Sequence, residues 1–405
     1  MPNYNRRQPS GSSFGGPGRR FSNNGRRPQQ KRRGGGEYIN PERFVQAAKP
    51  VVEEEVFVPK HQFADFDVEP IIKTNLTNAG FVSPSPIQDQ AIPFGIDGHD
   101  IVGIANTGTG KTAAFAIPVL HNMMRFSDAY ALIVAPTREL AQQIEEQCKM
   151  IGKGSGVMGA LLIGGMPMGP QLRQLRNNPQ IVIGTPGRIK DHVERGSLKL
   201  GHFNMIVLDE VDRMLDMGFL PDVSFILQQL APERQSYFFS ATMDPRVKSL
   251  ITQFAPKHVT ISLKKQATSE NVHQDVVHYA HTGEKVEKLH DILNNEDVEK
   301  VIVFDETQRN VEKLNQILQD RGFKAEAIHG GKTQGQRKRA LDQFKKNHVN
   351  ILVATDVAAR GIDVADVTHV INFGLPQTYD DYVHRIGRAG RAGRVGYALT
   401  FVPKH

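Results

Sequence analysis

Residues 105–112 have the types and spacing of a phosphate-binding loop. The segment reads Ala105, Asn106, Thr107, Gly108, Thr109, Gly110, Lys111 and Thr112. The glycines let backbone N–H groups turn toward phosphates, and a helix that begins at the lysine adds its partial positive charge. We expect Lys111 to reach the β and γ phosphates and Thr112 to ligate Mg²⁺. Ala105 stands where the usual pattern begins with glycine.

Paired acids occur further along the chain in Asp209-Glu210-Val211-Asp212. Asp209 is predicted to hold Mg²⁺ through water, and Glu210 to orient and deprotonate an attacking water. By itself such a pair is more often a solvated cap or turn. The phosphate-binding loop upstream favours the catalytic interpretation.

Arginines recur every three residues near the C-terminus, between Tyr382 and Arg391. They could form a solvated basic helix or a general nucleic-acid patch. Gly387 and Gly390 disfavour a long helix, however, and an arginine in a second domain could reach a γ-phosphate. An arginine that does so contributes roughly 10³–10⁵ in turnover.

These residues need elements that position them, and short apolar runs alternate with helical patterns along the chain. The expected strands are Asp100–Ala105, Ala131–Pro136, Ile181–Thr185, Met205–Glu210, Ser236–Thr242, His258–Leu263, Val276–His281, Val301–Glu306, Ala325–Gly330, Ile351–Asp356, His369–Gly374 and Gly396–Phe401. The expected helices include Thr112–Leu120, Arg138–Ile151, Glu284–Leu293 and Val311–Arg321. Continuous apolar runs are typical of parallel strands buried on both faces. The fold class is therefore α/β, with two tandem doubly wound parallel-sheet domains.

The domain boundaries follow from changes in composition. We predict a disordered basic tail over 1–36, an extended flank over 37–62, a first domain over 63–263, a linker over 264–271 and a second domain over 272–405. Ligands in such sheets bind beyond the carboxyl ends of the strands. The phosphate-binding loop, the acids at 209–212 and Ser240 all fall there.

Charge is concentrated in the tail, because residues 1–36 carry nine Lys or Arg and no acid. The 405-residue chain has a net charge of +7, so the remainder carries 7 − 9 = −2. The arginines alternate with Tyr4, Phe14 and Phe21, which favours salt-sensitive contact with phosphates and bases. A merely solubilising tail is the alternative.

Other compositional features restrict the class of protein. No run approaches the roughly 18 apolar residues of a membrane span, so no membrane association is expected. Cys148 is the only cysteine, so an intramolecular disulfide is impossible. A reducing cytoplasm is the expected compartment, and a monomer is the default.

With these pieces in order, the chain from Phe63 to Phe401 resembles a DEAD-box ATP-dependent RNA helicase of helicase superfamily 2, and the sheets are expected to be RecA-like. Phe63 and the run from Gly80 to Gln88 resemble the adenine-reading Q motif. The resemblance implies that Phe63 stacks on the base and that Gln88 selects adenine by paired hydrogen bonds.

The resemblance also implies residues for RNA binding and for coupling. The RNA-backbone residues are Pro136, Thr137, Arg138, Gly164, Gly165, Thr185, Gly187, Arg188, Arg337, Thr355 and Gly361. Residues that couple the ATP state to unwinding are Asp212, Ser240, Ala241, Thr242 and His384. Asp363 is expected near the ATP ribose, and Arg388 and Arg391 are the expected arginine fingers.

Several positions depart from the family pattern. Asp-Glu-Val-Asp replaces the name-giving motif, with Val211 for alanine, and we expect little loss of catalysis. Asn106 and Thr109 replace Gln and Ser, Ala389 replaces Thr, and Gly374 replaces a frequent Asp. The chain stops at His405, directly after the last expected strand, where the family usually adds a helix.

The predicted function is RNA-stimulated ATP hydrolysis coupled to local duplex unwinding or ribonucleoprotein remodelling. The cofactors are ATP and Mg²⁺, and the partner is single-stranded or short duplex RNA, bound with little sequence preference. One alternative is a non-catalytic RNA clamp or annealing factor that binds through the tail. Another is a DNA-directed motor of a related family, against which Gln88, Phe63 and Asp212 argue.

Overall fold

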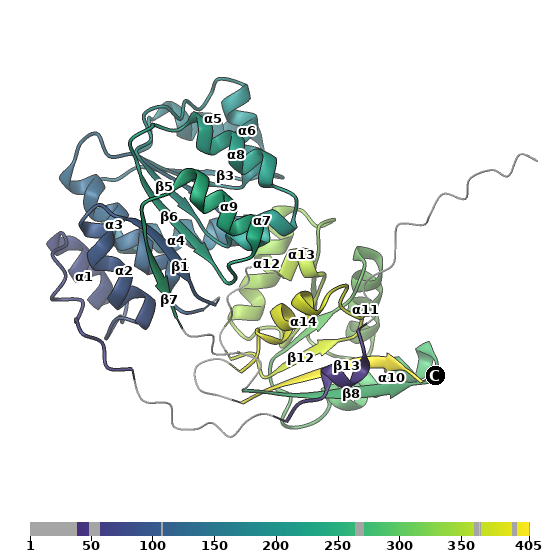
Figure 1. The fold of residues 1–405 in the computed structure, drawn as a ribbon. Helices are drawn as coiled ribbons and strands as arrows, with labels where there is room; N and C mark the ends of the chain where they lie inside the picture. The colour runs from purple at the N-terminus through teal and green to yellow at the C-terminus, as the bar shows by residue number, and fades with distance from the viewer. Residues whose placement is uncertain are drawn as a thin grey trace, which may run out of the picture. The chain divides into compact units, whose positions relative to one another are not determined.

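The computed structural model describes residues 39–47, 57–106, 108–263, 271–359, 364, 366–390 and 395–404. Tyr38–His405 forms one compact unit. Within it lie two α/β domains, each built on a parallel sheet (Figure 1).

The first domain contains seven strands in the order β3-β4-β2-β5-β6-β1-β7, and all neighbours are parallel. The strands are β1 (Asp100–Ile104), β2 (Ala131–Val134), β3 (Gly159–Leu162), β4 (Ile181–Gly184), β5 (Met205–Leu208), β6 (Gln235–Ser240) and β7 (His258–Ser262). The helices are α1 (Pro70–Asn78), α2 (Pro86–Ile96), α3 (Lys111–Arg125), α4 (Arg138–Ile151), α5 (Met168–Arg176), α6 (Pro186–Glu194), α7 (Val211–Asp216), α8 (Leu220–Gln229) and α9 (Pro245–Phe254).

Side chains alternate between the two faces of this sheet, and both faces are buried. Ile101 packs in a core that includes residues of α1 to α4, whereas Val102 packs in a second core with residues of α6 to α9. A sheet covered on both faces requires apolar residues at consecutive strand positions, which is the pattern of the sequence.

The second domain contains six strands in the order β10-β11-β9-β12-β13-β8, again all parallel. The strands are β8 (Val272–Tyr279), β9 (Val301–Phe304), β10 (Ala325–Ile328), β11 (Ile351–Ala354), β12 (His369–Asn372) and β13 (Gly396–Pro403). The helices are α10 (Thr282–Leu293), α11 (Gln308–Asp320), α12 (Gln334–Lys345), α13 (Asp356–Ala359) and α14 (Tyr379–Ile386).

The expected fold class is confirmed, with three local differences. Strand β3 was not predicted, because the four-residue run Gly159–Leu162 is short and opens with glycine. Strand β8 begins at Val272, four residues before its apolar pattern becomes clear. The prediction of an extended flank is wrong at Pro41–Phe44, which form a short 3-10 helix, η1.

In η1, the Asn40 side chain accepts a hydrogen bond from the Glu42 N–H at 3.1 Å, and proline stands at the first position. Both features favour a helical start.

Across the residues that the structure describes, no helix has the length and apolar character needed to cross a membrane.

Candidate functional site

The phosphate-binding loop joins β1 to α3, as the sequence predicts. Gly108 and Gly110 have φ of +85° and +92°, conformations that favour glycine. Lys111 opens α3 and is buried, and its Nζ lies 3.1 Å from the Ala105 carbonyl oxygen and 4.0 Å from Asp209 Oδ1. The lysine is thus directed back into the loop, where a phosphate would be held. Thr107 lies outside the described residues.

Ala105 extends the sheet rather than the turn. Its N–H donates to the Ser240 carbonyl at 3.0 Å, in continuation of the pairing between β1 and β6. A methyl group is therefore compatible with this position. Asn106 follows it, and its carbonyl accepts a hydrogen bond from the Thr109 hydroxyl at 2.9 Å.

Gln88 connects the Q-motif segment to the phosphate-binding loop. Its Nε2 donates to the Gly110 carbonyl at 3.0 Å, and its Oε1 accepts from the Ser85 N–H at 2.9 Å. The Ser85 hydroxyl donates to the Thr109 carbonyl at 2.8 Å. A Cβ at Gly110 would lie 2.4 Å from Gln88 Nε2, so this contact also requires glycine there.

Phe63 lies in the core of the first domain. It is 7% exposed and makes edge-to-face contacts with Phe66 and Phe81, with ring centroids 6.1 and 5.7 Å away. Stacking on a base is still a prediction for this residue.

A cavity of about 450 Å³ opens beside the phosphate-binding loop. Its walls include Gly108, Gly110, Lys111, Thr112, Asp209, Glu210 and side chains of α4. The carboxyl end of β5 brings the two acids to this cavity, at the edge of the sheet where β1 also ends. The described residues after β1 and β5 that are predicted to bind the nucleotide therefore lie next to one another around this cavity.

The pKa values of the two acids are shifted in opposite directions. Burial raises the pKa of Asp209 to about 6, although Lys111 opposes the effect. Burial alone would also raise the pKa of Glu210, but Arg213, Lys111, Arg388 and His384 together hold it below its usual value. Glu210 is thus kept as a carboxylate while it is 3% exposed.

Glu210 has a left-handed backbone, with φ 55° and ψ 54°, at the residue before α7. Such a conformation in a residue other than glycine costs on the order of 1–3 kcal/mol and is often found at functional sites. The left-handed conformation of Glu210 turns the chain sharply between β5 and α7. Val211, the next residue, is fully buried in the core, so its two methyl groups fit.

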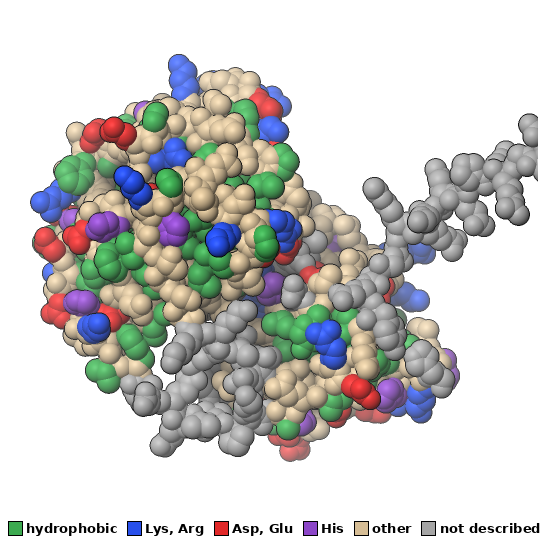
Figure 2. Space-filling view, in the orientation of Figure 1, with side chains coloured by type: hydrophobic (Ala, Val, Ile, Leu, Met, Phe, Trp, Pro, Cys, Tyr) green, Lys and Arg blue, Asp and Glu red, His purple; other side chains and the backbone are tan. Residues whose placement is uncertain are grey.

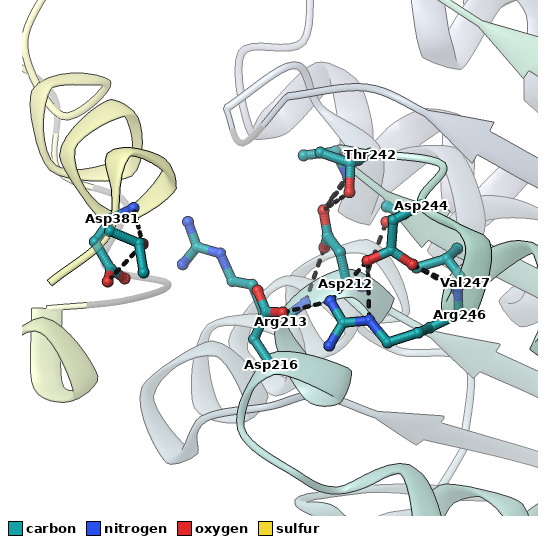
Figure 3. A network of polar contacts seen from close by, with 11 residues as sticks. Asp212, Arg213, Asp216, Thr242, Asp244, Arg246, Val247 and Asp381 are labelled. Atoms are coloured by element: carbon teal, nitrogen blue, oxygen red, sulfur yellow. Dashed lines mark hydrogen bonds and ion pairs between the residues drawn. The ribbon is translucent and has the colours of Figure 1, made fainter. Parts of the chain in front are cut away.

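Asp212 connects α7 to the segment after β6 (Figure 3). Its Oδ2 accepts hydrogen bonds from the Ala241 N–H at 3.1 Å and from the Thr242 N–H and hydroxyl at 2.9 and 3.1 Å. The Asp212 N–H donates to the Ser240 hydroxyl at 3.4 Å. Each bond to a charged acceptor contributes about 1.5–3 kcal/mol, so the two segments are expected to move together.

A second cavity, of about 410 Å³, collects the predicted RNA residues. Its lining includes Pro136, Thr137, Arg138, Gly164, Thr185, Gly187, Arg188 and Arg337. Of the other predicted RNA residues, Gly165 and Thr355 are not in this lining, and Gly361 lies outside the described residues. The Thr137 hydroxyl caps α4 by accepting a hydrogen bond from the Leu140 N–H at 3.3 Å.

Two glycines leave room for Arg138. A Cβ on Gly165 would lie 2.1 Å from a guanidinium nitrogen of Arg138, and one on Gly164 would lie 3.3 Å from another. Gly165 also has φ +76°. The Arg138 guanidinium therefore rests against the Gly164–Gly165 backbone.

Glu139 lies in the run Pro136–Leu140, which resembles an RNA-backbone motif, but no individual role was predicted for it. Its Oε2 lies 2.8 Å from Arg337 Nη2, and its Oε1 accepts from Gln334 Nε2 at 3.2 Å. Glu139 and Arg337 are both buried, and they belong to different domains. Its place in that run was the signal in the sequence, and nothing local identifies Arg337 as its partner.

The C-terminal arginines have different surroundings. Arg385 is 2% exposed and makes a bidentate pair with Asp356 at 2.6 and 2.7 Å. It also donates to the Asn372 side chain and the Gly374 carbonyl. Arg388 is buried just after α14 and contributes to the electrostatic environment of Glu210. Asp363 and Arg391 lie outside the described residues.

Gly374 has a steric explanation. A Cβ there would lie 2.8 Å from both Asp305 Oδ1 and the Glu306 backbone nitrogen. An aspartate would add a carboxylate beside the buried Asp305.

We expect Gly374→Asp to lower the free energy of unfolding by about 1–3 kcal/mol, the usual cost of overpacking. Gly335→Ala in the first turn of α12 is the matched control, because its Cβ would meet nothing within 4 Å. Chemical denaturation of both variants measures the difference. Equal stability of the two variants would contradict the steric explanation.

The fold and these cavities define a class: a nucleotide-binding protein built from two tandem RecA-like domains. Residues 85–250 match the DEAD/DEAH box helicase family model, and residues 284–393 match the helicase conserved C-terminal domain.

The chain is 44% identical over 343 residues to the ATP-dependent RNA helicase CshA of Listeria monocytogenes, covering 84% of this chain and 66% of that protein. It is 43% identical over 343 residues to CshA of Bacillus licheniformis, covering 84% and 70%. S. cerevisiae Dbp5 bound to RNA and ADP BeF3 superposes with a TM-score of 0.74 and 29% identity, over 85% of this chain and 90% of that one. The chain therefore belongs to the DEAD-box family of ATP-dependent RNA helicases, which are ATP-hydrolysing enzymes.

Proposed function

We propose that this protein is an RNA-stimulated ATPase that unwinds short duplexes, or remodels ribonucleoproteins, by local strand destabilisation. One observation carries the proposal: α4 contributes to the lining of both cavities. Thr137 and Arg138, where α4 begins, line the cavity with the predicted RNA residues. Leu140, Gln143 and Gln147, further along α4, line the cavity of the phosphate-binding loop. A helix shared by two sites is a physical route for coupling between them.

In the first cavity, Lys111 would bind the β and γ phosphates, and Gln88 and Phe63 would select adenine. Glu210 would accept a proton from the attacking water, since it is kept ionised by its cationic neighbours. Asp209-Glu210-Val211-Asp212 would act as the name-giving motif of the family. Arg388, Arg391 and Asp363 would complete the site from the second domain.

Oxygen donors fit Mg²⁺ at this site. Thr112 offers a hydroxyl and Asp209 a carboxylate within the same cavity, and Mg²⁺ prefers oxygen ligands and retains several waters. Among the described residues, no three His, Cys, Asp or Glu side chains form a metal cluster. A site with few protein ligands is what nucleotide-bound Mg²⁺ requires. The ion would neutralise charge on the phosphates when it is bound with ATP.

In the second cavity, Thr137, Arg138, Thr185 and Arg188 would contact phosphates and 2′-hydroxyls, which makes binding selective for RNA but tolerant of sequence. The Asp212 contacts to Ala241 and Thr242 would transmit the nucleotide state.

The proposed compartment is the cytoplasm. Burial raises the pKa of the Cys148 thiol to about 12, so this thiol is expected to be unreactive.

Steady-state ATP hydrolysis, measured with and without single-stranded RNA at two salt concentrations, tests the proposal. RNA is expected to stimulate hydrolysis, and Lys111→Ala to abolish it. RNA binding without hydrolysis at either salt would favour the clamp instead. Stimulation by DNA equal to that by RNA would favour the DNA-directed motor.

Deletion of residues 1–36 is expected to weaken RNA binding moderately and to reduce its salt dependence, because nine cations are removed. Stimulated ATP hydrolysis should persist at saturating RNA. On the face in view, basic and acidic side chains of the described residues are interspersed rather than gathered in one patch (Figure 2). Complete loss of RNA affinity in the deletion would show that the tail does most of the binding, as the clamp hypothesis requires.

A further inference from the structure

Residues 39–46 precede the first domain in the sequence, yet they pack on the second. In Figure 1 the purple η1 lies against β8, although β8 begins more than 200 residues later. We call residues 39–46 the docking segment. Its helical turn ends with Phe44, which is 1% exposed.

Phe44 anchors the segment in an apolar cluster of the second domain. Its ring centroid lies 4.7 Å from that of Tyr382, and the cluster also contains Val272, Ile386 and Ala398. Ile39 packs at its margin. A buried aromatic ring of this kind removes 150–250 Å² from water, which is a large contribution for so short a segment.

The backbone of the segment also pairs with the sheet. Gln46 and Gln274 form an antiparallel bridge, in which the two N–H groups donate to the opposite carbonyls at 3.0 and 2.8 Å. The β8 strand is the outer strand of its sheet, so its free edge is partly covered by this bridge. Addition of an extended segment to a sheet edge is a common mode of peptide recognition.

Side chains connect the bridge to α14. Gln274 is 1% exposed, and its Oε1 accepts a hydrogen bond from the Tyr382 hydroxyl at 2.9 Å. The Arg43 guanidinium lies 3.8 Å from the centroid of the Tyr379 ring. The docking segment, β8 and α14 therefore form one packed unit.

The geometry of α14 gives this contact a functional meaning. Tyr379, Tyr382 and Ile386 recur at helical spacing and form the side that faces the docking segment. Arg385 is directed elsewhere, to Asp356 and Asn372. Arg388 follows the same helix, so the position of α14 decides where this arginine lies.

We propose that residues 39–46 are an integral part of the second domain and hold α14 in the position that its arginine requires. Phe44 is a positioning residue that acts through Tyr382. The second domain is then built from two stretches, 39–46 and 272–404, and the first domain is inserted between them. The docking half of the proposal stands on packing alone, whereas the effect on turnover rests on the proposed ATPase function.

Hydrogen exchange of the full chain tests the docking. Phe44→Ala is expected to speed exchange of the Gln274 amide and of α14 amides by at least roughly 10-fold, since local opening becomes easier. Val45→Ala is the matched control, because Val45 is 55% exposed in the same segment. Amides of α3 should be unchanged in both variants, which shows that the first domain remains folded. Equal exchange of β8 and α14 in the two variants would overturn the proposal.

Truncations test the functional half. Deletion of residues 1–36 leaves the docking segment in place, whereas deletion of residues 1–47 removes it. Only the second is expected to lower kcat at saturating RNA, by between about 3- and 100-fold, because small displacements of catalytic groups are costly. A synthetic peptide of residues 38–47 should restore kcat. Equal kcat in both deletions would refute positioning, whereas absence of ATP hydrolysis in the full chain would refute the proposed function and leave the exchange result to decide docking.

Discussion

Replacement of Glu210 by glutamine is expected to lower RNA-stimulated ATP turnover by roughly 10²–10⁴-fold, the usual contribution of a general base. The amide keeps the size of the side chain but cannot accept a proton. The cations around Glu210 keep its carboxylate ionised despite its burial, which is the form that can accept a proton. Binding of ATP and RNA should be retained, because Lys111, Gln88 and the second cavity are unchanged.

Single-turnover hydrolysis together with equilibrium binding of a fluorescent ATP analogue measures both effects. Glu233→Gln is the control, since it makes the same chemical change at an exposed position of the first domain. Turnover of Glu210→Gln equal to that of the control would remove Glu210 from the role of base.

The second large effect is expected for Arg388→Ala, with a loss of roughly 10³–10⁵ in kcat if Arg388 is an arginine finger. Arg388 contributes to the electrostatic environment of Glu210, so its charge acts on the predicted base. Arg339→Ala is the matched control, because Arg339 is exposed on α12 of the same domain.

Arg385→Ala is expected to behave differently, although it is only three residues away. The variant removes the guanidinium that pairs with both carboxylate oxygens of Asp356. Removal of one partner of a buried ion pair typically lowers the free energy of unfolding by about 3–5 kcal/mol. Its main effect should appear in chemical denaturation of the second domain. Full kcat in Arg388→Ala, or an Arg385→Ala variant as stable as wild type, would contradict this division of roles.

The residues that form the first cavity, and their contacts, can be predicted only in part from the local sequence. The loop at 105–112 and the acids at 209–212 are contiguous motifs, so their chemistry is recognisable without a structure. Their proximity requires β1 and β5 to end at the same edge of one sheet, which the alternation of apolar runs and helical patterns also indicates. The hydrogen bond from Gln88 to the Gly110 carbonyl is not visible in any local pattern, because it joins residues 22 positions apart through side-chain geometry.

The arginines near the C-terminus show the same limit more clearly. Arg385 and Arg388 belong to the same series of arginines at three-residue spacing. In the structure, Arg385 is bound by Asp356, Asn372 and Gly374. Arg388 instead acts electrostatically on Glu210. Arg385 lies on α14 and is held by Asn372 at the end of β12 and by Asp356 at the start of α13, whereas Arg388 follows the end of the helix at Ile386. A periodicity of three identifies a cluster but does not assign its members.

By itself, the sequence determined the α/β class, most strand and helix positions, the phosphate-binding loop, the acidic pair and the membership of the helicase family. Each of these features depends on residues close together in the sequence, or on the order of such local motifs along the chain. The tertiary structure decided the Glu139–Arg337 pair, the different surroundings of Arg385 and Arg388, the short strand β3 and the packing of Phe44 on Tyr382. Each of these depends on contacts between residues far apart in the chain, where burial and geometry, rather than local pattern, select the partner.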